Sequence, residues 1–239
     1  MNSGNPIKIS EANYQQILSE SDRLMFTDAY IPEKHQWQVS SGANWQVHIN
    51  LPWDSVPDKN GQIQKKDDHH LALVMIRAGI ASTGYFHNGK LIDHKVFRAY
   101  MVRQKQGKSQ VKYLKTKGKS RAGSRVRLGE TIEFFKEINT RLTSYSNEFP
   151  IDMWGISCAK TLLPYLFSSE PKPPFTKNQK NLFSIPFHVQ HPGLETLELI
   201  HKKLNQFYGL ISESGAEFFD FSIKSDHPDP DKNELDEDW

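Results

Sequence analysis

The chain has 239 residues, of which 37% are hydrophobic and 24% are charged, values ordinary for a folded protein with a core of its own. A single cysteine excludes an internal disulfide and is typical of a reducing compartment. The amino terminus has no apolar leader, and the longest apolar run, residues 71–76, is too short to cross a bilayer. We therefore expect a cytoplasmic protein with no membrane partner.

The net charge of +2 conceals two blocks of opposite sign. Residues 95–129 contain twelve Lys and Arg and no Asp or Glu, whereas residues 226–239 contain seven acidic residues and one Lys. The basic block predicts contact with a polyanion. The acidic block is typical of a solvated, disordered tail.

The amino-terminal part of the chain predicts a helix, a hairpin and a loop. Within residues 1–24, Ser10 is placed to cap a short amphipathic helix. Two strand-like runs, Gln36–Val39 and Trp45–Ile49, flank the turn S-S-G-A. Residues 51–68 are polar and rich in turn-forming residues, so we expect a loop there.

A three-stranded meander follows. Leu71–Arg77, Ile80–His87 and Lys90–Phe97 each favour a strand, and Asn88-Gly89 between the last two is a strong hairpin signal. Gln104–Gly123 then has no apolar pattern and holds seven Lys or Arg and three glycines. A stretch of this length without a pattern indicates a functional or disordered loop.

The second half of the chain alternates helices and strands. An apolar stripe predicts a long amphipathic helix from Leu128, Ile132, Phe135, Ile138 and Leu142. Ile151–Cys158, Ala159–Phe167 and Leu182–Val189 predict a strand, a helix and a strand. A last helix is expected from the stripe Leu194, Leu197, Ile200, Leu204 and Phe207. This order of elements predicts an α/β (α+β) fold with a mixed sheet covered by helices.

The stretch Q-G-K-S-Q, residues 106–110, holds the residues best suited to chemistry. Gly107 lets the backbone turn sharply or approach a ligand closely. The Gln110 amide can accept a hydrogen bond from an attacking hydroxyl or donate one to a developing oxyanion, but it is no strong base. Because the surrounding Lys and Arg suit phosphates, these residues indicate chemistry on a nucleic-acid end.

The stretch A-Y-M-V-R-Q-K-Q-G-K-S-Q, followed by S-R-A-G-S-R-V-R and a long amphipathic helix, resembles the Vms-like release factor (VLRF) family. That family is related to the catalytic central domain of eukaryotic and archaeal peptide-chain release factors. Its loop has a Gly-x-x-Gln tip, after an Arg-x-x-Gln lead-in and before a Ser-x-Ala-Gly element. The matching residues here are Arg103, Gln106, Gly107, Gln110, Ser120, Ala122 and Gly123. Lys108 departs from the second glycine that many relatives have at the loop tip.

The resemblance implies a release-factor central-domain-like (RNase H-like) fold with a long mobile basic loop, as in bacterial members that consist almost of this domain alone. It implies ribosome rescue, in which stalled nascent chains are freed by hydrolysis of peptidyl-tRNA or by cleavage of the tRNA 3′ CCA end. The implied partners are the large ribosomal subunit, peptidyl-tRNA and rRNA, and no DNA. The implied catalytic residues are Gly107, Ser109 and Gln110. The implied RNA-binding residues are Arg103, Lys105, Lys108, Lys112, Lys119, Arg121, Arg125 and Arg127.

Two other classes of function compete with this one. A non-catalytic RNA- or ribosome-binding module would use Tyr100 and Tyr113, which lie among the basic residues, to stack on bases, and it would not need Gln110. For a metal enzyme, the best candidates are the run Asp67–His70 and the pair His188 and His191, and neither has a convincing third ligand. We therefore expect no metal and no cofactor.

Cys158 ends an apolar run and is expected to be a buried small hydrophobic residue rather than a nucleophile. The expected domain organisation has three parts. Residues 1–68 pack on the core, residues 69–224 form the release-factor-like catalytic domain with its loop at 104–123, and residues 225–239 form the acidic tail.

Overall fold

A computed structural model describes residues 6–99 and 119–219 of the chain, and in helix α2 (Lys119–Glu148) it describes the side chains from Gly129 onward. The chain forms two compact units. Unit 1 consists of residues 1–28, 38–49 and 207–239, and unit 2 consists of residues 29–37 and 50–206. Among the described residues, no helix is both long enough and apolar enough to cross a membrane.

Helix α1 (Glu11–Arg23) of unit 1 begins where the sequence predicts. The Ser10 hydroxyl accepts a hydrogen bond from the Asn13 backbone N–H, and the Asn13 side chain accepts one from the Ser10 N–H. This reciprocal pair satisfies two amide groups that a helix start leaves without partners. On the apolar face of the helix, Tyr14 is fully buried and stacks on Phe207, with 5.1 Å between the ring centroids.

Most of a five-stranded sheet lies in unit 1, in the order β1 (Ile7–Ile9), β12 (Phe207–Ile211), β4 (Asn44–Asn50), β3 (Gln36–Ser41) and β2 (Thr27–Ile31). The predicted hairpin of β3 and β4 is confirmed. The sequence analysis missed β1, β2 and β12, and it wrongly assigned Phe207 to the last helix. Phe207 instead begins β12, which pairs antiparallel with β1. A short 3-10 helix, Gly215–Glu217, follows β12.

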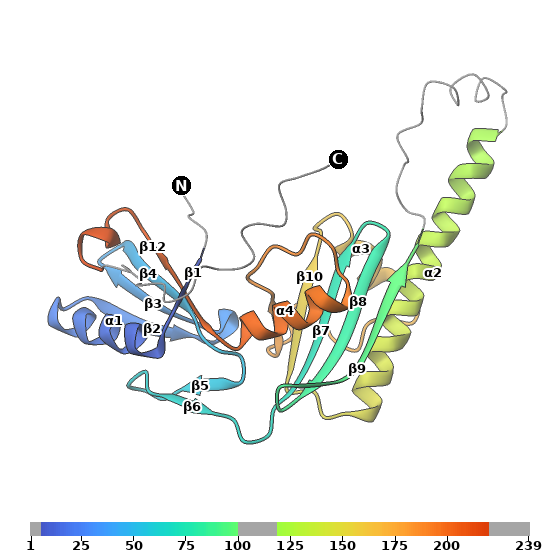
Figure 1. Cartoon of the computed structure of the whole chain (residues 1–239). Helices are drawn as coiled ribbons and strands as arrows, with labels where there is room; N and C mark the ends of the chain where they lie inside the picture. Colours follow the sequence, from blue (N-terminus) through green and yellow to red (C-terminus); the bar gives the residue numbers. More distant parts are fainter. Residues whose placement is uncertain (1–5, 100–118, 220–239) are drawn as a thin grey trace. The chain divides into compact units, whose positions relative to one another are not determined.

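Unit 2 is built on a mixed sheet in the order β11 (Leu182–Ser184), β10 (Met153–Cys158), β7 (His70–Arg77), β8 (Ile80–His87) and β9 (Lys90–Arg98) (Figure 1). β10 runs parallel to both β7 and β11, and the meander of β7, β8 and β9 is antiparallel, as predicted. Asn88 and Gly89 have φ values of 48° and 80°, the left-handed conformations that a tight hairpin turn requires.

Helices cover both faces of this sheet, which confirms the predicted α+β architecture (Figure 1). Helices α2 and α3 (Leu163–Ser168) pack on one face, against Ala72, Val74 and Ile76 of β7. Helix α4 (Leu194–Leu204) packs on the other face, against Leu71, Leu73 and Met75. The two faces of β7 alternate along the strand because successive side chains of a strand point to opposite sides.

Several boundaries differ from the predictions. The segment 51–68, expected as a loop, contains a small hairpin of β5 (Ser55–Pro57) and β6 (Ile63–Lys65), and a short 3-10 helix, Pro32–Lys34, precedes β3. The predicted strand Leu182–Val189 is paired only as far as Ser184, and α3 begins at Leu163 rather than Ala159. Helix α2 begins at Lys119, inside the predicted loop 104–123, because Lys, Arg and Ala favour a helix even without an apolar stripe.

Candidate functional site

Residues 100–118, called the basic segment below, connect the end of β9 to the start of α2. The chain leaves the sheet at Arg98 and Ala99, and the Ala99 N–H donates a hydrogen bond of 2.9 Å to the carbonyl of Gly79 in the neighbouring turn. It resumes at Lys119, the first residue of α2. Both described ends of the segment therefore belong to elements of the unit 2 sheet and its covering helix.

The predicted site residues fall into two groups. Those of the first group lie outside the described residues: Arg103, Lys105, Gly107, Lys108, Ser109, Gln110 and Lys112. Those of the second group lie in the first turns of α2, where the backbone is described and the side chains are not: Lys119, Arg121, Arg125 and Arg127. Their roles stay predictions.

Helix α2 is fixed firmly on the sheet beyond its basic first turns. Phe135, Ile138 and Leu142 are almost completely buried against the sheet. The Asn139 side-chain amide donates to the carbonyls of Leu166 and Pro171, at 2.9 and 2.8 Å, which ties the helix to the chain around α3. This packing fixes the later turns of α2, the helix that follows the basic segment, on the sheet.

An ion pair and a ring contact join α2 to β9. Arg141 pairs with Asp93 of β9, and both side chains are about 30% exposed. The Arg141 guanidinium also lies 5.0 Å from the centroid of the Tyr145 ring. The strand before the basic segment and the helix after it are thus joined by charge as well as by apolar packing.

Arg77 is a described cation near the start of the basic segment that the sequence analysis did not single out. It closes β7, and its guanidinium donates to the Ser157 hydroxyl of β10 at 3.1 Å and to the Ile76 carbonyl at 2.8 Å. In the register of the sheet it lies opposite Ile80, which also pairs with the exposed Arg98 of β9. The available signal was a charged residue directly after the apolar run 71–76.

Cys158 ends β10 at this same end of the sheet. Burial raises the pKa of its thiol to about 11, and the nearby Arg77 charge offsets this only in part. The side chain is therefore a neutral thiol at physiological pH, which makes it a poor nucleophile. Cys158 packs against the core of unit 2, but it is partly buried rather than fully buried as the sequence predicts.

The structure separates the residues of the candidate metal cluster. His69 is buried, and burial lowers the pKa of its imidazole to about 4, so it is neutral. Its neighbours Asp68 and His70 lie together with His87, which the sequence analysis did not connect with them. Among the described residues, this is the one group of three His, Cys, Asp or Glu side chains arranged in this way, and it includes neither His188 nor His191.

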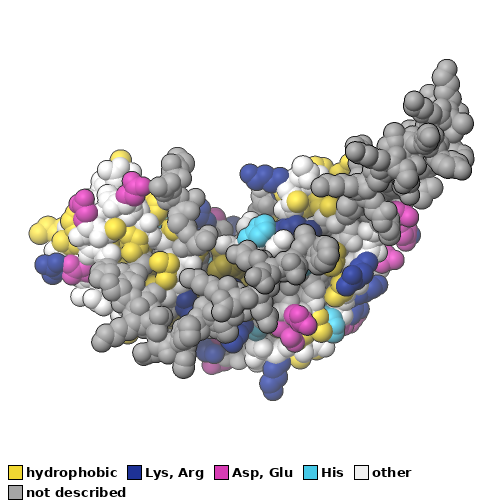
Figure 2. Space-filling view, turned by 45° about the horizontal axis from the view of Figure 1, so that its top comes forward, with side chains coloured by type: hydrophobic (Ala, Val, Ile, Leu, Met, Phe, Trp, Pro, Cys, Tyr) yellow, Lys and Arg dark blue, Asp and Glu magenta, His cyan; other side chains and the backbone are white. Residues whose placement is uncertain are grey.

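The visible surface of the described residues shows no single basic patch. In Figure 2, Lys and Arg side chains are dispersed, and Asp and Glu side chains lie between them. The positive charge is instead concentrated along the sequence, in the basic block of residues 95–129.

The profile of the Bacteroidetes VLRF1 release factor family matches residues 71–209, which run from β7 into β12 and include the basic segment and α2. The match identifies a release-factor-like protein of translation, and it confirms the resemblance found in the sequence. The chain belongs to the Bacteroidetes VLRF1 release factor family.

The chain was also compared with solved structures and with curated proteins. A solved structure described as the Vms1 mitochondrial localization core is similar to this chain at 12% sequence identity and a TM-score of 0.39. The similarity covers 83% of this chain and 84% of that one. A search among curated proteins found no match.

Proposed function

We propose that this protein rescues stalled ribosomes by freeing the nascent chain from peptidyl-tRNA, and that the segment holding Gly107 and Gln110 enters the reaction centre. The observation that supports this most is the extent of the family match. It includes β9, the whole basic segment and α2. The large ribosomal subunit, peptidyl-tRNA and rRNA are the proposed partners, the cytoplasm is the proposed location, and residues 69–224 are the proposed catalytic domain.

In this proposal Gln110 positions the nucleophile. Its neutral amide cannot remove a proton at neutral pH, but it can accept a hydrogen bond from water or from a ribose 2′-hydroxyl and donate one to the charge that develops. Attack by water on the aminoacyl ester would hydrolyse peptidyl-tRNA. Attack by a 2′-hydroxyl on the adjacent phosphate would cut the tRNA near its 3′ end and leave terminal nucleotides on the peptide.

The basic residues have a separate role, which is to hold RNA. Lys and Arg neutralise phosphates and release condensed counterions, so binding weakens as salt rises. Arg103, Lys105 and Lys112 would act from the segment itself, with Ser109 beside the catalytic glutamine and Lys108 at the tip. Lys119, Arg121, Arg125 and Arg127 would act from the start of α2.

The elements at the two ends of the segment support this division of roles. Its two ends join β9 and α2, which the pair of Arg141 and Asp93 holds together. A long segment on such a base can reach a distant centre while the folded unit contacts the surrounding RNA. Arg77 and Arg98, at the same end of the sheet, are proposed as additional RNA contacts.

The alternative is an RNA- or ribosome-binding module without catalysis, and two variants distinguish it from the enzyme. Gln110→Leu removes the proposed catalytic amide and leaves every positive charge. A variant with Lys112, Lys115 and Lys117 all changed to Ala removes three charges and leaves Gln110. Gln64→Leu, an exposed position in β6, is the matched control for the first variant.

Ribosome binding by sedimentation and peptide release from stalled complexes are measured for each variant. The enzyme account predicts that Gln110→Leu binds normally but does not release, and that the triple lysine variant loses binding with a shallower salt dependence. If Gln110→Leu acts like Gln64→Leu in both assays while the triple variant fails, the binding module is the better description.

A further inference from the structure

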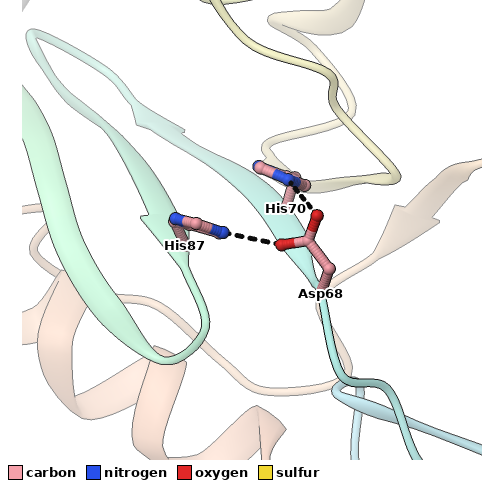
Figure 3. A group of neighbouring side chains, drawn as sticks. All are labelled: Asp68, His70 and His87. Carbon is pink, nitrogen blue, oxygen red and sulfur yellow. Dashed lines mark hydrogen bonds and ion pairs between the residues drawn. The ribbon is translucent and has the colours of Figure 1, made fainter.

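A second cluster of chemically capable side chains lies on unit 2, at the opposite end of the sheet from the basic segment. Asp68 lies in the bend just before β7, two residues ahead of His70, the first residue of that strand, and its carboxylate faces the His70 imidazole. His70 of β7 is directly opposite His87 of β8 in the register of the hairpin. The three side chains converge in Figure 3, where one oxygen of the Asp68 carboxylate faces each imidazole.

The distances within this cluster are short. The His87 Nε2 atom lies 2.7 Å from one carboxylate oxygen of Asp68, and the His70 Nε2 atom lies 3.2 Å from the other (Figure 3). The two imidazole rings are stacked, with centroids 4.4 Å apart and planes 7° from parallel. One ligand atom from each residue can be chosen so that all three lie within 4.8 Å of one another.

We propose that Asp68, His70 and His87 bind a divalent first-row transition-metal ion, with Zn²⁺ the best fit. Two imidazole nitrogens and one carboxylate oxygen are a donor set that zinc accepts, and water would complete the coordination. Ligand bonds of about 2.0–2.2 Å put the atoms around a tetrahedral zinc about 3.4 Å apart. Side-chain rotation can supply this contraction, because Asp68 and His87 are 69% and 39% exposed.

A tyrosine supports the histidine that is least exposed. The Tyr85 hydroxyl lies 2.6 Å from Nδ1 of His70, and the Tyr85 ring stacks on Phe149 with centroids 3.9 Å apart. A hydroxyl can both donate and accept. It can therefore donate to Nδ1 while Nε2–H faces Asp68, and accept from Nδ1–H when Nε2 turns its lone pair to a metal. Such a partner to the second imidazole nitrogen is typical of histidine ligands.

The backbone holds the same ligand in place. The His70 N–H donates to a carboxylate oxygen of Asp152 at 2.8 Å, and the Asp152 N–H donates to the His70 carbonyl at 3.0 Å. This fixes the start of β7 beside the start of β10. Of the three ligands, His70 is thus held rigidly, while Asp68 and His87 have the freedom to adjust around an ion.

The position of the cluster separates it from the proposed reaction. β8 and β9 pair from His87 opposite Lys90 at one end to Ile80 opposite Arg98 at the other. The length of this pairing is about 23 Å at ordinary strand spacing. The basic segment leaves the sheet beyond Arg98, so a metal at Asp68 would stabilise the hairpin and the chain entering β7 rather than act on the nucleophile.

The sequence analysis predicted no metal because the run Asp67–His70 has no convincing third ligand nearby in the sequence. The register of β7 and β8 supplies that ligand, since it brings His87 from 17 residues further along the chain to His70. His69, next to His70, is buried and is not a member of the cluster. The cluster therefore depends on strand pairing, which a linear motif does not reveal.

The test measures Zn²⁺ binding to the full chain, prepared metal-free and without a histidine tag, by isothermal titration calorimetry with zinc chloride. Co²⁺ is used in parallel, because its visible absorption reports ligation directly. The variants are Asp68→Asn, His87→Ala and Tyr85→Phe. The matched control is His94→Ala, which removes an exposed histidine from the next strand. Circular dichroism checks that each variant is folded.

We expect wild type and His94→Ala to bind one Zn²⁺ with the same affinity and to rise in melting temperature when it is added. Tyr85→Phe should weaken binding by about 10–100-fold, the usual cost of losing a hydrogen-bond partner of a ligand. His87→Ala and Asp68→Asn should weaken it further and abolish the Co²⁺ spectrum. The proposal is overturned if wild type does not bind Zn²⁺, or if His87→Ala and Asp68→Asn bind it as tightly as wild type.

Discussion

Arg141 of helix α2 and Asp93 of strand β9 form an ion pair that joins the helix after the basic segment to the strand before it. Each partner also has a place in the packing of unit 2. Arg141 lies over the Tyr145 ring, and Asp93 faces Tyr85 in the register of β8 and β9. The pair therefore connects the two anchors between which the proposed catalytic residues lie.

Removal of one partner of this ion pair should destabilise the protein. In Asp93→Ala the half-buried Arg141 charge loses its acceptor, and we expect the free energy of unfolding to fall by about 1–2 kcal/mol. Urea denaturation measures the change. Glu133→Ala is the control, because it breaks an exposed pair with Lys136 on the same helix and should cost about 0.5 kcal/mol or less. Equal losses in the two variants would show that the partly buried pair of Arg141 and Asp93 contributes no more to stability than an exposed pair.

Gly155 and Gly129 should respond in opposite directions to the same substitution. A Cβ at Gly155 of β10 would lie 2.5 Å from a Leu73 methyl and 2.7 Å from the Trp53 ring, both buried, so Gly155→Ala should cost about 1–3 kcal/mol. A Cβ at Gly129 of α2 would meet nothing within 4 Å, and Gly129→Ala should raise stability by about 0.5–1 kcal/mol. Thermal denaturation of the two variants tests both predictions. A Gly155→Ala protein as stable as wild type would contradict the close packing of Leu73 and Trp53 against the Gly155 backbone.

His201 should make the protein sensitive to mild acid. Its ring stacks on Phe86 with centroids 3.9 Å apart, and burial lowers its pKa to about 4, which the charge of Asp54 opposes only in part. The His201 imidazole takes up a proton near pH 6.5 in the unfolded chain but only near pH 4 in the folded chain. The contribution of His201 to stability is therefore fully present above pH 6.5 and is lost as the pH falls toward 4. We expect a loss of about 2 kcal/mol from this group between pH 7 and pH 5.

The difference between wild type and His201→Gln isolates this effect. Groups that titrate in the same range without interacting with His201 are present in both proteins and cancel in the comparison. The His201 charge also lowers the pKa of the buried His69, so the measured difference includes this coupling between the two histidines. Urea midpoints at several pH values should therefore converge as the pH falls from 7 to 5, with His201→Gln losing less stability. Parallel pH profiles for the two proteins would show that His201 does not carry the effect.

Local signals in the sequence predicted the local parts of the fold. Ser10 caps the helix that it was predicted to cap, and Asn88-Gly89 makes the turn of the β8–β9 hairpin. Phe207 shows where local signals fail. It continues the apolar spacing of α4, yet it begins β12, because its pairing partner is β1 at the other end of the chain. No window of sequence contains both strands.

The candidate site residues likewise divide into those that local sequence reveals and those that only strand pairing reveals. Gly107 and Gln110 are recognisable because a short motif and its neighbours along the chain carry the family resemblance. Arg77 and His87 were not recognised, because their significance comes from residues that strand pairing brings beside them: Ser157 in one case, Asp68 and His70 in the other. A site carried by a linear motif can be proposed from sequence, and the roles of Gly107 and Gln110 stay predictions, whereas a site assembled across strands requires the register.

The central claim, that Gln110 is the catalytic residue of a release reaction, is tested most directly by single-turnover peptide release. Stalled ribosome–nascent-chain complexes carrying 3′-labelled peptidyl-tRNA are mixed with saturating wild type, Gln110→Leu or Gln64→Leu, and one gel resolves free peptide and tRNA length. We predict that Gln64→Leu equals wild type and that Gln110→Leu releases about 10²–10³-fold more slowly, the usual cost of losing one well-placed polar group at a reaction centre. Full-length tRNA would identify ester hydrolysis, and shortened tRNA would identify cleavage near the 3′ end. Release by Gln110→Leu at the wild-type rate, or no release by wild type, would contradict the account.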